Sequence, residues 1–512
     1  MRNLPLPFAL LLQSTYGLTA YSDVCSQIAT SISVPSAVHY SGNDNFKKLS
    51  EHWATTSNQV PVCVVEPHST DDVGKILQIV GKTRTPFAVM GGGHALSPYL
   101  SSTEGVHIST SAFKSIEYDE RTETVTFGAG LKWDELYVAL EKHGVNVPGG
   151  RIPGVGVGGF ILGGGYSLHT NQVGLTIDNV EAFELVKPNG EVVEVTHESD
   201  PDLFFALKGG GNNFGIVTKF TLKTFRQGQV WGGSITYANS GVFAAVNAAT
   251  AKFAAEVADP KAVILSYTTL FQGTVSCSSI PHPSENAIHT PQALLQVQLF
   301  YDAPEPPAGI FDEFLNISSV GSAVTSQSFS TMISAITSTR DLAGLRAHSL
   351  GVSVPAYSLK FMNVLAEQVL STGPDLTNKS VIFMALVSEP FLPTILSHNP
   401  HTTAYPFTRD TMYTPFTLFT AWTDPDQDDP IKNEVEGIRE VLLKTLLEEG
   451  YEDVSTSPLY PNYSAWDAPL ERIYGKSLPR LQQVKRRVDP EDVMGLAGGF
   501  KVSPKAAIRD EL

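Results

Sequence analysis

The sequence has little of what would place it in several large classes of protein. Its three cysteines in 512 residues are too few for a disulfide framework, and none stands in a C-x-x-C arrangement typical of zinc or dithiol chemistry. Acidic residues outnumber basic ones 52 to 35, which gives a net charge of −17. Because that charge repels phosphate backbones and anionic lipid surfaces, we expect neither nucleic acid nor a membrane as a partner.

Familiar catalytic motifs are also missing. The segment 165–169, GYSLH, fails the G-x-S-x-G nucleophile pattern at its last position, and there is no H-E-x-x-H motif or P-loop. His398 and His401 are separated by Asn-Pro, which prevents a shared helical face, so we expect no metal site there. The one basic cluster, Lys485-Arg486-Arg487, falls in a predicted helix beside acidic residues and is interpreted as a solvated face.

No long apolar run occurs after the N-terminus, since none reaches the roughly 18 residues needed to span a bilayer. At the N-terminus, a lone Arg2, an apolar stretch over 4–12 and small or polar residues up to Ala20 have the three-part layout of a secretory signal. Pro5 and Pro7 weaken that pattern, and an ordinary apolar arm is the alternative. We therefore expect a signal peptide over 1–20 and a secreted protein.

Features near the expected mature end are compatible with secretion. Cys25 lies just inside that end and Cys63 lies in a strand-like run, so a single disulfide could pin the N-terminal arm to the first sheet, with Cys277 left over. Asn316 and Asn378 stand in N-x-S sequences that are formal glycosylation acceptors. The sequence thus predicts a disulfide-bonded glycoprotein.

What the chain has in abundance is glycine, 42 residues in all. The first unit from Val60 reads as strand, helix and second strand ending at Met90, with Ser69 and Thr70 as helix caps. Gly91-Gly92-Gly93 follows at once. Such a turn lets backbone N–H groups approach an anion closely, so it is a candidate pyrophosphate cradle, with a plain tight turn as the alternative.

The densest glycine segment runs over 149–165, GGRIPGVGVGGFILGGG, where ordinary strands and helices lose stability through backbone entropy. Gly154, Gly156 and Gly159 formally match G-x-G-x-x-G. We reject a Rossmann fold, because Pro148 and Pro153 flank the motif where a strand should precede it. A dinucleotide held by another loop architecture is still the expected ligand.

Further strands and helices are predicted before and after the middle third of the chain. Residues 180–186 and 191–195 around Asn189-Gly190 indicate a β-hairpin, 202–207 a short helix, and 478–488 a closing helix. From about 227 to 450 glycine clusters give way to strand-like runs such as LLQVQLFY and VIFMALVSE between amphipathic helices. This change in composition and pattern indicates a separate domain of sheet plus helices.

Three glycine motifs follow in a fixed order: VMGGGHALSP from Val89, GGRIPGVGVGGFILGGGYSLHTNQVGLTIDNV from Gly149, and LKGGGNNFGIVTKF from Leu207. In order and spacing they resemble the FAD-linked oxidases of the vanillyl-alcohol oxidase, or PCMH-type, superfamily. The tail, with YPNYSAW from Tyr460 and RLQQVKRRVDPEDV from Arg480, is similar to the berberine-bridge-enzyme-like branch of that superfamily.

The resemblance implies an α+β fold in two parts. The N-terminal half and the C-terminal tail would form a PCMH-type FAD-binding domain, into which a substrate domain of antiparallel sheet plus helices is inserted. We place the FAD-binding domain at 21–226, the substrate domain at 227–450, and the berberine-bridge-like segment that completes the first domain at 451–512.

The same resemblance implies roles for single residues. His94 matches the histidine that bonds covalently to the flavin, and Ile152 stands where a second, cysteinyl link would be, so we expect FAD attached through His94 alone. Val155 corresponds to the residue that gates oxygen beside the flavin, where valine favours O2 as acceptor. Further implied contacts to the cofactor are Gly91, Gly92, Gly93, Ala95, Gly158, Gly159, Gly163, Gly164, Val217 and Asn462.

For the catalytic base, the resemblance directs attention to Tyr460 and Tyr463, between which the sequence does not choose. A tyrosine with an ordinary pKa near 10 needs a neighbouring cation or the flavin to act at neutral pH, and mere packing on the ring is the alternative. An additional acid or base from the middle domain near Trp422-Thr-Asp424 is also left open. No metal is expected in this site.

The sequence leaves three functions open. The first is a covalent FAD oxidase that passes a hydride from a small alcohol or natural-product intermediate to flavin N5 and then electrons to O2. The second is a carbohydrate oxidase, or a flavin dehydrogenase with another acceptor. The third is a non-catalytic secreted binder of flavin or sugar, against which the retention of His94 and the 460–463 segment argues.

Overall fold

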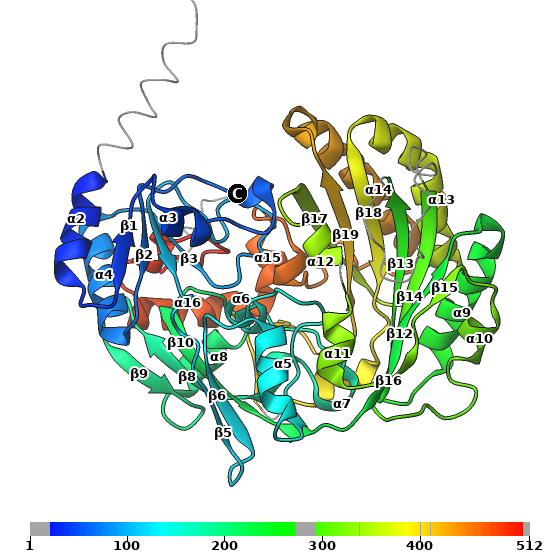
Figure 1. Ribbon diagram of the computed structural model, residues 1–512, viewed down its shortest axis with the longest axis horizontal. Helices are drawn as coiled ribbons and strands as arrows, with labels where there is room; N and C mark the ends of the chain where they lie inside the picture. The colour runs from blue at the N-terminus through cyan, green and yellow to red at the C-terminus, as the bar shows by residue number, and fades with distance from the viewer. Residues whose placement is uncertain (1–20, 273–291, 337, 400, 410, 505–512) are drawn as a thin grey trace, which may run out of the picture.

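The computed structural model describes residues 21–272, 292–336, 338–399, 401–409 and 411–504 (Figure 1). The chain has an α+β fold. Two sheets with their helices are built from the N-terminal half of the chain, and one large antiparallel sheet is built from the middle (Figure 1). The predicted signal peptide and Cys277 lie outside the described residues.

The first sheet has the order β1-β2-β4-β3, with strands β1 (Ala37–His39), β2 (Cys63–Glu66), β4 (Val106–Ser109) and β3 (Phe87–Met90). β1 is antiparallel to β2, and β2, β4 and β3 are parallel. Helix α4 (Thr70–Thr83) connects β2 to β3 as predicted. Ser69 accepts a hydrogen bond from the Asp72 N–H at the helix start, and the apolar face of the helix is buried against this sheet.

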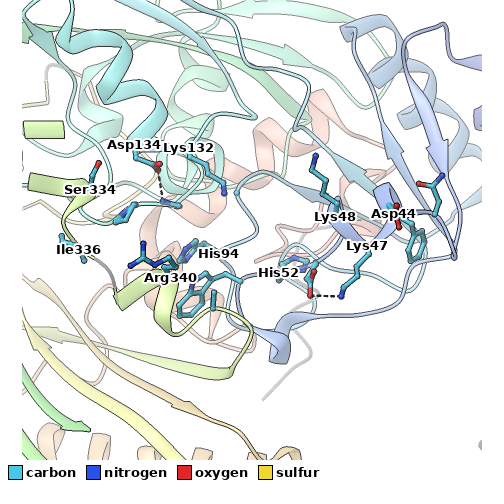
Figure 2. A pocket seen from close by; sticks show the side chains of 18 of the residues that line it. Asp44, Lys47, Lys48, His52, His94, Lys132, Asp134, Ser334, Ile336 and Arg340 are labelled. Atoms are coloured by element: carbon cyan, nitrogen blue, oxygen red, sulfur yellow. Dashed lines mark hydrogen bonds and ion pairs between the residues drawn. The ribbon is translucent and has the colours of Figure 1, made fainter. Parts of the chain in front are cut away.

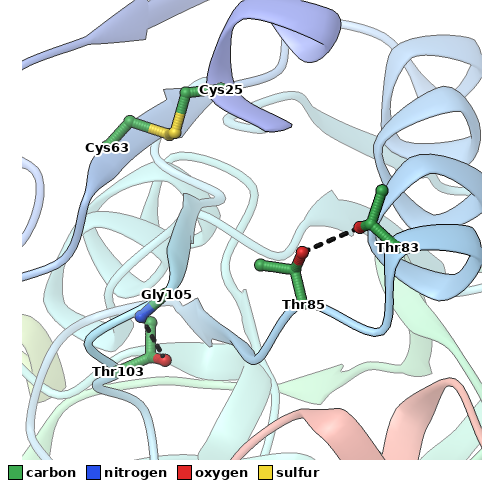
Figure 3. Close-up of a disulfide and its surroundings, with 6 residues drawn as sticks. All are labelled: Cys25, Cys63, Thr83, Thr85, Thr103 and Gly105. Carbon is green, nitrogen blue, oxygen red and sulfur yellow. Dashed lines mark hydrogen bonds between the residues drawn. A yellow bond between two sulfur atoms is a disulfide. The ribbon is translucent and has the colours of Figure 1, made fainter. Parts of the chain in front are cut away.

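The predicted disulfide between Cys25 and Cys63 is present (Figure 3). It joins helix α2 (Ser22–Ser31) to β2, and both cysteines are fully buried. The bond therefore ties the N-terminal helix to the first sheet.

The second sheet is antiparallel, with the order β5-β6-β10-β8-β9. Its strands are β5 (Ile116–Asp119), β6 (Thr124–Gly128), β10 (Ile216–Lys223), β8 (Val180–Val186) and β9 (Val192–Val195). The β8–β9 hairpin confirms the Asn-Gly turn prediction, and Gly190 has the positive φ of +90° that the turn requires. Around this sheet lie α5 (Trp133–Glu141), α7 (Thr170–Val173), α8 (Pro201–Leu207) and the short strands β7 (Val145–Asn146) and β11 (Phe225–Arg226).

The glycine-rich segment contains a helix that its composition did not predict. Helix α6 (Val157–Leu162) includes two glycines in six residues. Val157 and Ile161 are fully buried on it. Tertiary packing of these two side chains thus outweighs the entropic cost of the glycines. The nearest strand before the segment is the two-residue β7 (Val145–Asn146), which does not lead directly into the motif at Gly154, in agreement with the rejection of a Rossmann fingerprint.

The third sheet holds the middle of the chain and is antiparallel throughout, in the order β15-β12-β14-β13-β18-β19-β17 with β16 also paired to β12. Its strands are β12 (Val230–Tyr237), β13 (Ala262–Phe271), β14 (Gln292–Tyr301), β15 (Gly321–Ser322), β16 (Thr325–Gln327), β17 (Arg346–Val354), β18 (Val381–Ser388) and β19 (Thr414–Trp422). Helices α9 (Phe243–Glu256), α13 (Leu359–Asn378) and α14 (Asp428–Glu448) pack on its outer face (Figure 1). Its inner face is turned toward the N-terminal sheets.

The C-terminal tail returns to the N-terminal half, where α16 (Leu478–Val488) lies beside α8. The helix has the predicted bounds, but interpreting its basic cluster as solvated is wrong for Lys485. That side chain is fully buried and its Nζ contacts the Asp489 carboxylate at 2.7 Å and the Asn213 carbonyl at 3.0 Å. A buried lysine with two such partners fastens the tail to the glycine-rich 209–215 segment. Across the described ranges, no helix combines the length and the apolar character that crossing a bilayer demands.

Candidate active site

A cavity of about 550 Å³ lies between the glycine-rich loops and the inner face of the eight-stranded sheet. It brings together almost all the residues that the sequence predicts for the site. Those on its wall are Gly91, Gly92, Gly93, His94, Ala95, Val155, Gly158, Gly159, Gly163, Val217, Tyr460, Asn462 and Tyr463. Gly164 is not among them. Its φ is +122° and a Cβ there would lie 2.7 Å from the Tyr405 ring, so this glycine is required by backbone conformation and packing.

The glycines on the wall serve two different purposes. Gly92 and Gly156 pack back to back, because a Cβ on Gly92 would lie 2.3 Å from the Gly156 nitrogen. Gly158 and Gly159 instead have open space before them. A Cβ on Gly159 would meet no atom within 4 Å, and one on Gly158 would meet only the Ala129 carbonyl at 3.6 Å. Side chains at these two positions would project into the cavity, where a flat ligand could otherwise lie against the backbone.

His94 stands at one end of the cavity with its ring stacked on Trp53, at 4.9 Å between centroids and 18° between planes. Its Nε2 is buried and has no hydrogen-bond partner among the described residues. Burial, with a smaller contribution from Lys132, lowers the pKa of His94 to about 4. The imidazole is therefore neutral at physiological pH and keeps a lone pair available for bonding.

On its other side His94 borders a second, wider cavity of about 1120 Å³ (Figure 2). Lys47, Lys48, Lys132 and Arg340 stand around that space, and Asp134 accepts a hydrogen bond from the Gly154 N–H at 2.8 Å at its edge. His94, Trp53 and Gly92 belong to the walls of both cavities. The two cavities thus meet at the His94 ring.

The two tyrosines of the C-terminal tail have different surroundings. The Tyr460 hydroxyl accepts a hydrogen bond from Asn462 Nδ2 at 2.9 Å, and burial raises its pKa to about 12. The Tyr463 hydroxyl donates to Glu389 Oε1 at 2.7 Å and accepts a short hydrogen bond from Arg151 Nη2. Burial raises the pKa of Tyr463 well above its ordinary value, an effect that the Arg151 cation opposes. Tyr463 alone has both a cation and a proton acceptor beside it.

Arg151 and Glu389 are functional candidates that the sequence did not single out. Their side chains form a two-point ion pair, with Nη1 to Oε2 at 2.7 Å and Nη2 to Oε1 at 2.9 Å. The side chain of Arg151 is 10% exposed and that of Glu389 is 1% exposed. A signal for Arg151 existed, since it is the only charged residue in the glycine-rich segment 149–165. Glu389 ends the apolar run VIFMALVSE, where a carboxylate is out of pattern.

The region near Trp422, where the sequence left open an additional acid or base, holds no part of this site. Trp422 is fully buried between the sheet and α14, where its Nε1 donates to Asp428, and the Asp424 carboxylate accepts from the Asp426 N–H. Neither residue lines the cavity. The carboxylate that the middle domain does place on the cavity wall is that of Glu389, directly after β18.

Comparison with known proteins identifies the two segments that form the glycine-rich wall and the tail. The FAD binding domain family matches residues 61–196, and the family described as berberine and berberine like matches residues 459–497. An uncharacterized FAD-linked oxidoreductase of Arthroderma benhamiae is 36% identical over 286 residues, which are 55% of this chain and 53% of that protein. The match thus spans about half the length of that relative. The FAD-dependent monooxygenase drtC of Aspergillus calidoustus is 26% identical over 95% of this chain and 91% of its own.

Solved structures share the fold at low identity. BBE-like 1 of Physcomitrella patens superposes with a TM-score of 0.74 at 18% identity, covering 94% of this chain and 99% of its own. Xylooligosaccharide oxidase of Myceliophthora thermophila C1 superposes with a TM-score of 0.73 at 19% identity, covering 95% and 100%. These likenesses show a shared fold, in which the segment matched by the FAD binding domain family, a large antiparallel sheet and a returning C-terminal segment are arranged alike.

The residues present fit FAD. The cavity has a wall of exposed backbone at Gly158 and Gly159, on which a flat ring system could rest without meeting a side chain. It extends to Val217, Asn212 and the 499–500 segment, which leaves room for a long ligand. At its edge the neutral His94 offers an unpaired, buried nitrogen.

Proposed function

Because the chain contains an FAD binding domain and a berberine-like C-terminal segment, we propose that it is an FAD-linked oxidase that holds its FAD by one covalent bond to His94. It would oxidise a small organic alcohol or natural-product intermediate and pass the electrons to O2. The bound FAD supplies the hydride acceptor and the route to O2, with H2O2 as the product. The observation that carries the proposal is the single cavity that joins the bare glycine wall, His94 and the Tyr463–Glu389 hydrogen bond.

His94 is suited to a covalent anchor because of its surroundings. Burial keeps its imidazole neutral, and Trp53 fixes the plane of the ring. A neutral nitrogen without a hydrogen-bond partner is nucleophilic, whereas a protonated or bonded one is not. Ile152 lines the same cavity and offers no sulfur, which supports attachment through one residue.

Tyr463 and Glu389 supply the proton transfer. As a substrate hydroxyl gives its proton to the Tyr463 oxygen, the phenolic proton of Tyr463 passes to Glu389 Oε1 along the 2.7 Å hydrogen bond. Arg151 contacts both oxygens and stabilises the negative charge wherever it lies on this path. Tyr460 instead packs edge-on against Tyr166 and Tyr463 and orients the segment.

Secretion and glycosylation belong to the same proposal. The Cys25–Cys63 disulfide is of a kind that forms in oxidising compartments, and the Asn316 and Asn378 side chains are exposed on the surface. These observations support passage of the chain through a secretory route.

The test is stoichiometric. The purified holoprotein is supplied with a panel of alcohols and sugars, and O2 uptake and H2O2 release are recorded together. We expect one H2O2 per O2, and a loss of at least about 100-fold in kcat for Tyr463→Phe and Glu389→Gln, in line with the usual contribution of general acid–base catalysis. Turnover with a dye but not with O2 would assign the dehydrogenase function, and flavin binding with no turnover on any acceptor would leave a binding protein. Sugars as the preferred substrates would favour the carbohydrate oxidase.

A further inference from the structure

The cavity that faces the candidate cofactor site is lined almost entirely by uncharged side chains. Among its described lining residues, only Arg151 and Glu389 carry a full charge at neutral pH, since burial keeps His94 neutral. The lysines and the arginine around the second cavity (Figure 2) do not line this one. The charge preference of the substrate site therefore depends on these two residues.

Arg151 and Glu389 neutralise each other completely. Both guanidinium nitrogens that face the carboxylate contact it, at 2.7 and 2.9 Å, and the Tyr463 hydroxyl occupies a further position on each group. The Glu389 N–H in turn donates to the Tyr357 hydroxyl at 3.0 Å, which fixes the residue at the end of β18. The positions that these contacts fill are not open to a charged ligand.

A charged substrate would have to break this pair. A carboxylate that bound Arg151 would displace Glu389 and leave it buried without a counter-ion, and an ammonium that bound Glu389 would do the same to Arg151. Binding elsewhere in the cavity would leave the substrate charge itself without a partner, at the cost of its lost hydration. Either route makes the binding of a charged molecule much weaker than that of an uncharged one of the same shape.

The rest of the sheet face offers neutral polar groups on one side and apolar ones on the other. Tyr267 on β13 is paired in register with Gln296 on β14 and with Val387 on β18, which is paired with Thr417 on β19. All four line the cavity, and Tyr267, Gln296 and Thr417 bring neutral polar groups to it. Toward Trp53 the wall is apolar, with Leu96, Leu342, Phe383 and Phe419. The wall thus matches a molecule with hydroxyl or carbonyl groups at one end and an apolar, ring-sized portion at the other.

We propose that the substrate is uncharged at neutral pH, a hydroxyl-bearing compound with one apolar end, and that the Arg151–Glu389 pair excludes amines and carboxylic acids. This inference rests on the proposed function, because it assigns the cavity to the substrate of the flavin reaction. It assigns to the pair a role in specificity besides its contact with Tyr463.

The test uses matched sets of three compounds that differ in charge. One set is 4-hydroxybenzyl alcohol, 4-hydroxybenzylamine and 4-hydroxybenzoate, and the other is glucose, glucosamine and glucuronate. Binding to the purified protein at pH 7 is measured by calorimetry and, in parallel, by perturbation of flavin absorbance. We expect the neutral member of at least one set to bind at least ten-fold tighter than both charged members. Equal affinities, preference for a charged member, or no neutral binding in either set overturns the proposal.

Two variants should change the charge preference of the binding site in opposite directions. Glu389→Gln leaves the Arg151 cation unpaired, so the carboxylate member should gain at least ten-fold in affinity. Arg151→Met leaves the Glu389 carboxylate unpaired, so the ammonium member should gain instead. A variant that merely misfolds gains neither. Asp178→Asn is the matched control, because Asp178 is the fully buried partner of Arg409 in an ion pair that does not line the cavity.

The outcomes separate this inference from the function on which it rests. Protein that carries no flavin, or that carries it without any redox turnover, contradicts the proposed function whatever the calorimetry shows. The inference on the substrate alone is contradicted if the wild type carries flavin and turns over, while the flavin-bearing variants Glu389→Gln and Arg151→Met keep the charge preference of the wild type.

Discussion

The guanidinium of Arg151 and the carboxylate of Glu389 are 238 positions apart in the chain and meet in a two-point contact at 2.7 and 2.9 Å. Arg151 belongs to the glycine-rich segment and Glu389 to the end of a strand of the large sheet. Tyr463, from the C-terminal tail, contacts both. One buried pair therefore joins the three parts of the chain at the place where chemistry is proposed.

Removing one partner of this pair should be more harmful than removing both charges. Arg151→Met leaves a carboxylate buried without its cation, which we expect to lower the free energy of unfolding by about 3–5 kcal/mol. The double variant Arg151→Met/Glu389→Gln should recover part of that loss. Denaturant unfolding of the single and double variants measures the coupling, and strictly additive effects would show that the two groups do not interact.

Val155 should control access of oxygen. It lines the cavity, and Val155→Ile adds one methyl group there. We expect the rate at which dithionite-reduced flavin is reoxidised by O2 to fall at least about ten-fold, which corresponds to about 1.4 kcal/mol in the barrier. Val138→Ile adds the same methyl group on the exposed face of α5, outside the cavity, and serves as the control. An unchanged rate in Val155→Ile would remove Val155 from the oxygen path.

Much of the fold could be predicted because its signals are local. The signals for Ser69 at the start of α4, the Asn-Gly turn between β8 and β9, and the closing helix α16 each lie within a few residues of sequence, and the structure confirms all three. Helix α6 was not predicted, since it depends on burial of Val157 and Ile161 against distant parts of the chain.

The candidate site was predicted only in part for the same reason. Glycine motifs and His94 stand out in the sequence by composition and resemblance. The partnership of Glu389 with Arg151 is set by the register of a sheet inserted between them, and no local pattern encodes it. Lys485 was assigned wrongly because its local pattern is misleading. It belongs to a run of basic residues that resembles a solvated face, yet Asp489 and Asp492 make its burial tolerable.

The disulfide should stabilise the N-terminal helix against the first sheet. It closes a loop with a sequence separation of 38 residues, for which loop-closure entropy predicts a contribution of about 2–4 kcal/mol. The double variant Cys25→Ala/Cys63→Ala should lose that much free energy of unfolding, with its flavin content unchanged. Equal stability of wild type and variant would contradict a stabilising role.

Acid should destabilise the protein through His107 on β4. Burial, with a smaller contribution from His52, lowers the pKa of His107 to about 3, and its Nε2 has no partner among the described residues. The unfolded chain takes up a proton on this ring below about pH 6.5 and the folded chain does not, so stability is lost as pH falls from about 6.5 toward 3. At pH 5 the loss from this residue is about 2 kcal/mol.

The variant His107→Gln removes that proton uptake. We expect the decrease in unfolding free energy between pH 7 and pH 5 to be smaller in His107→Gln than in wild type by about 2 kcal/mol. His68→Gln alters an exposed histidine and serves as the control. Equal pH dependence in His107→Gln and wild type would contradict the assignment.

The most direct test of the account is whether flavin remains with the protein after acid precipitation. Wild type, His94→Ala and the exposed-site control His68→Ala are precipitated in acid, washed, and examined for yellow colour and flavin absorbance in the pellet. We expect flavin to stay with wild type and with His68→Ala and to be released from His94→Ala. Release from wild type, or retention by His94→Ala, would contradict attachment of the cofactor at His94.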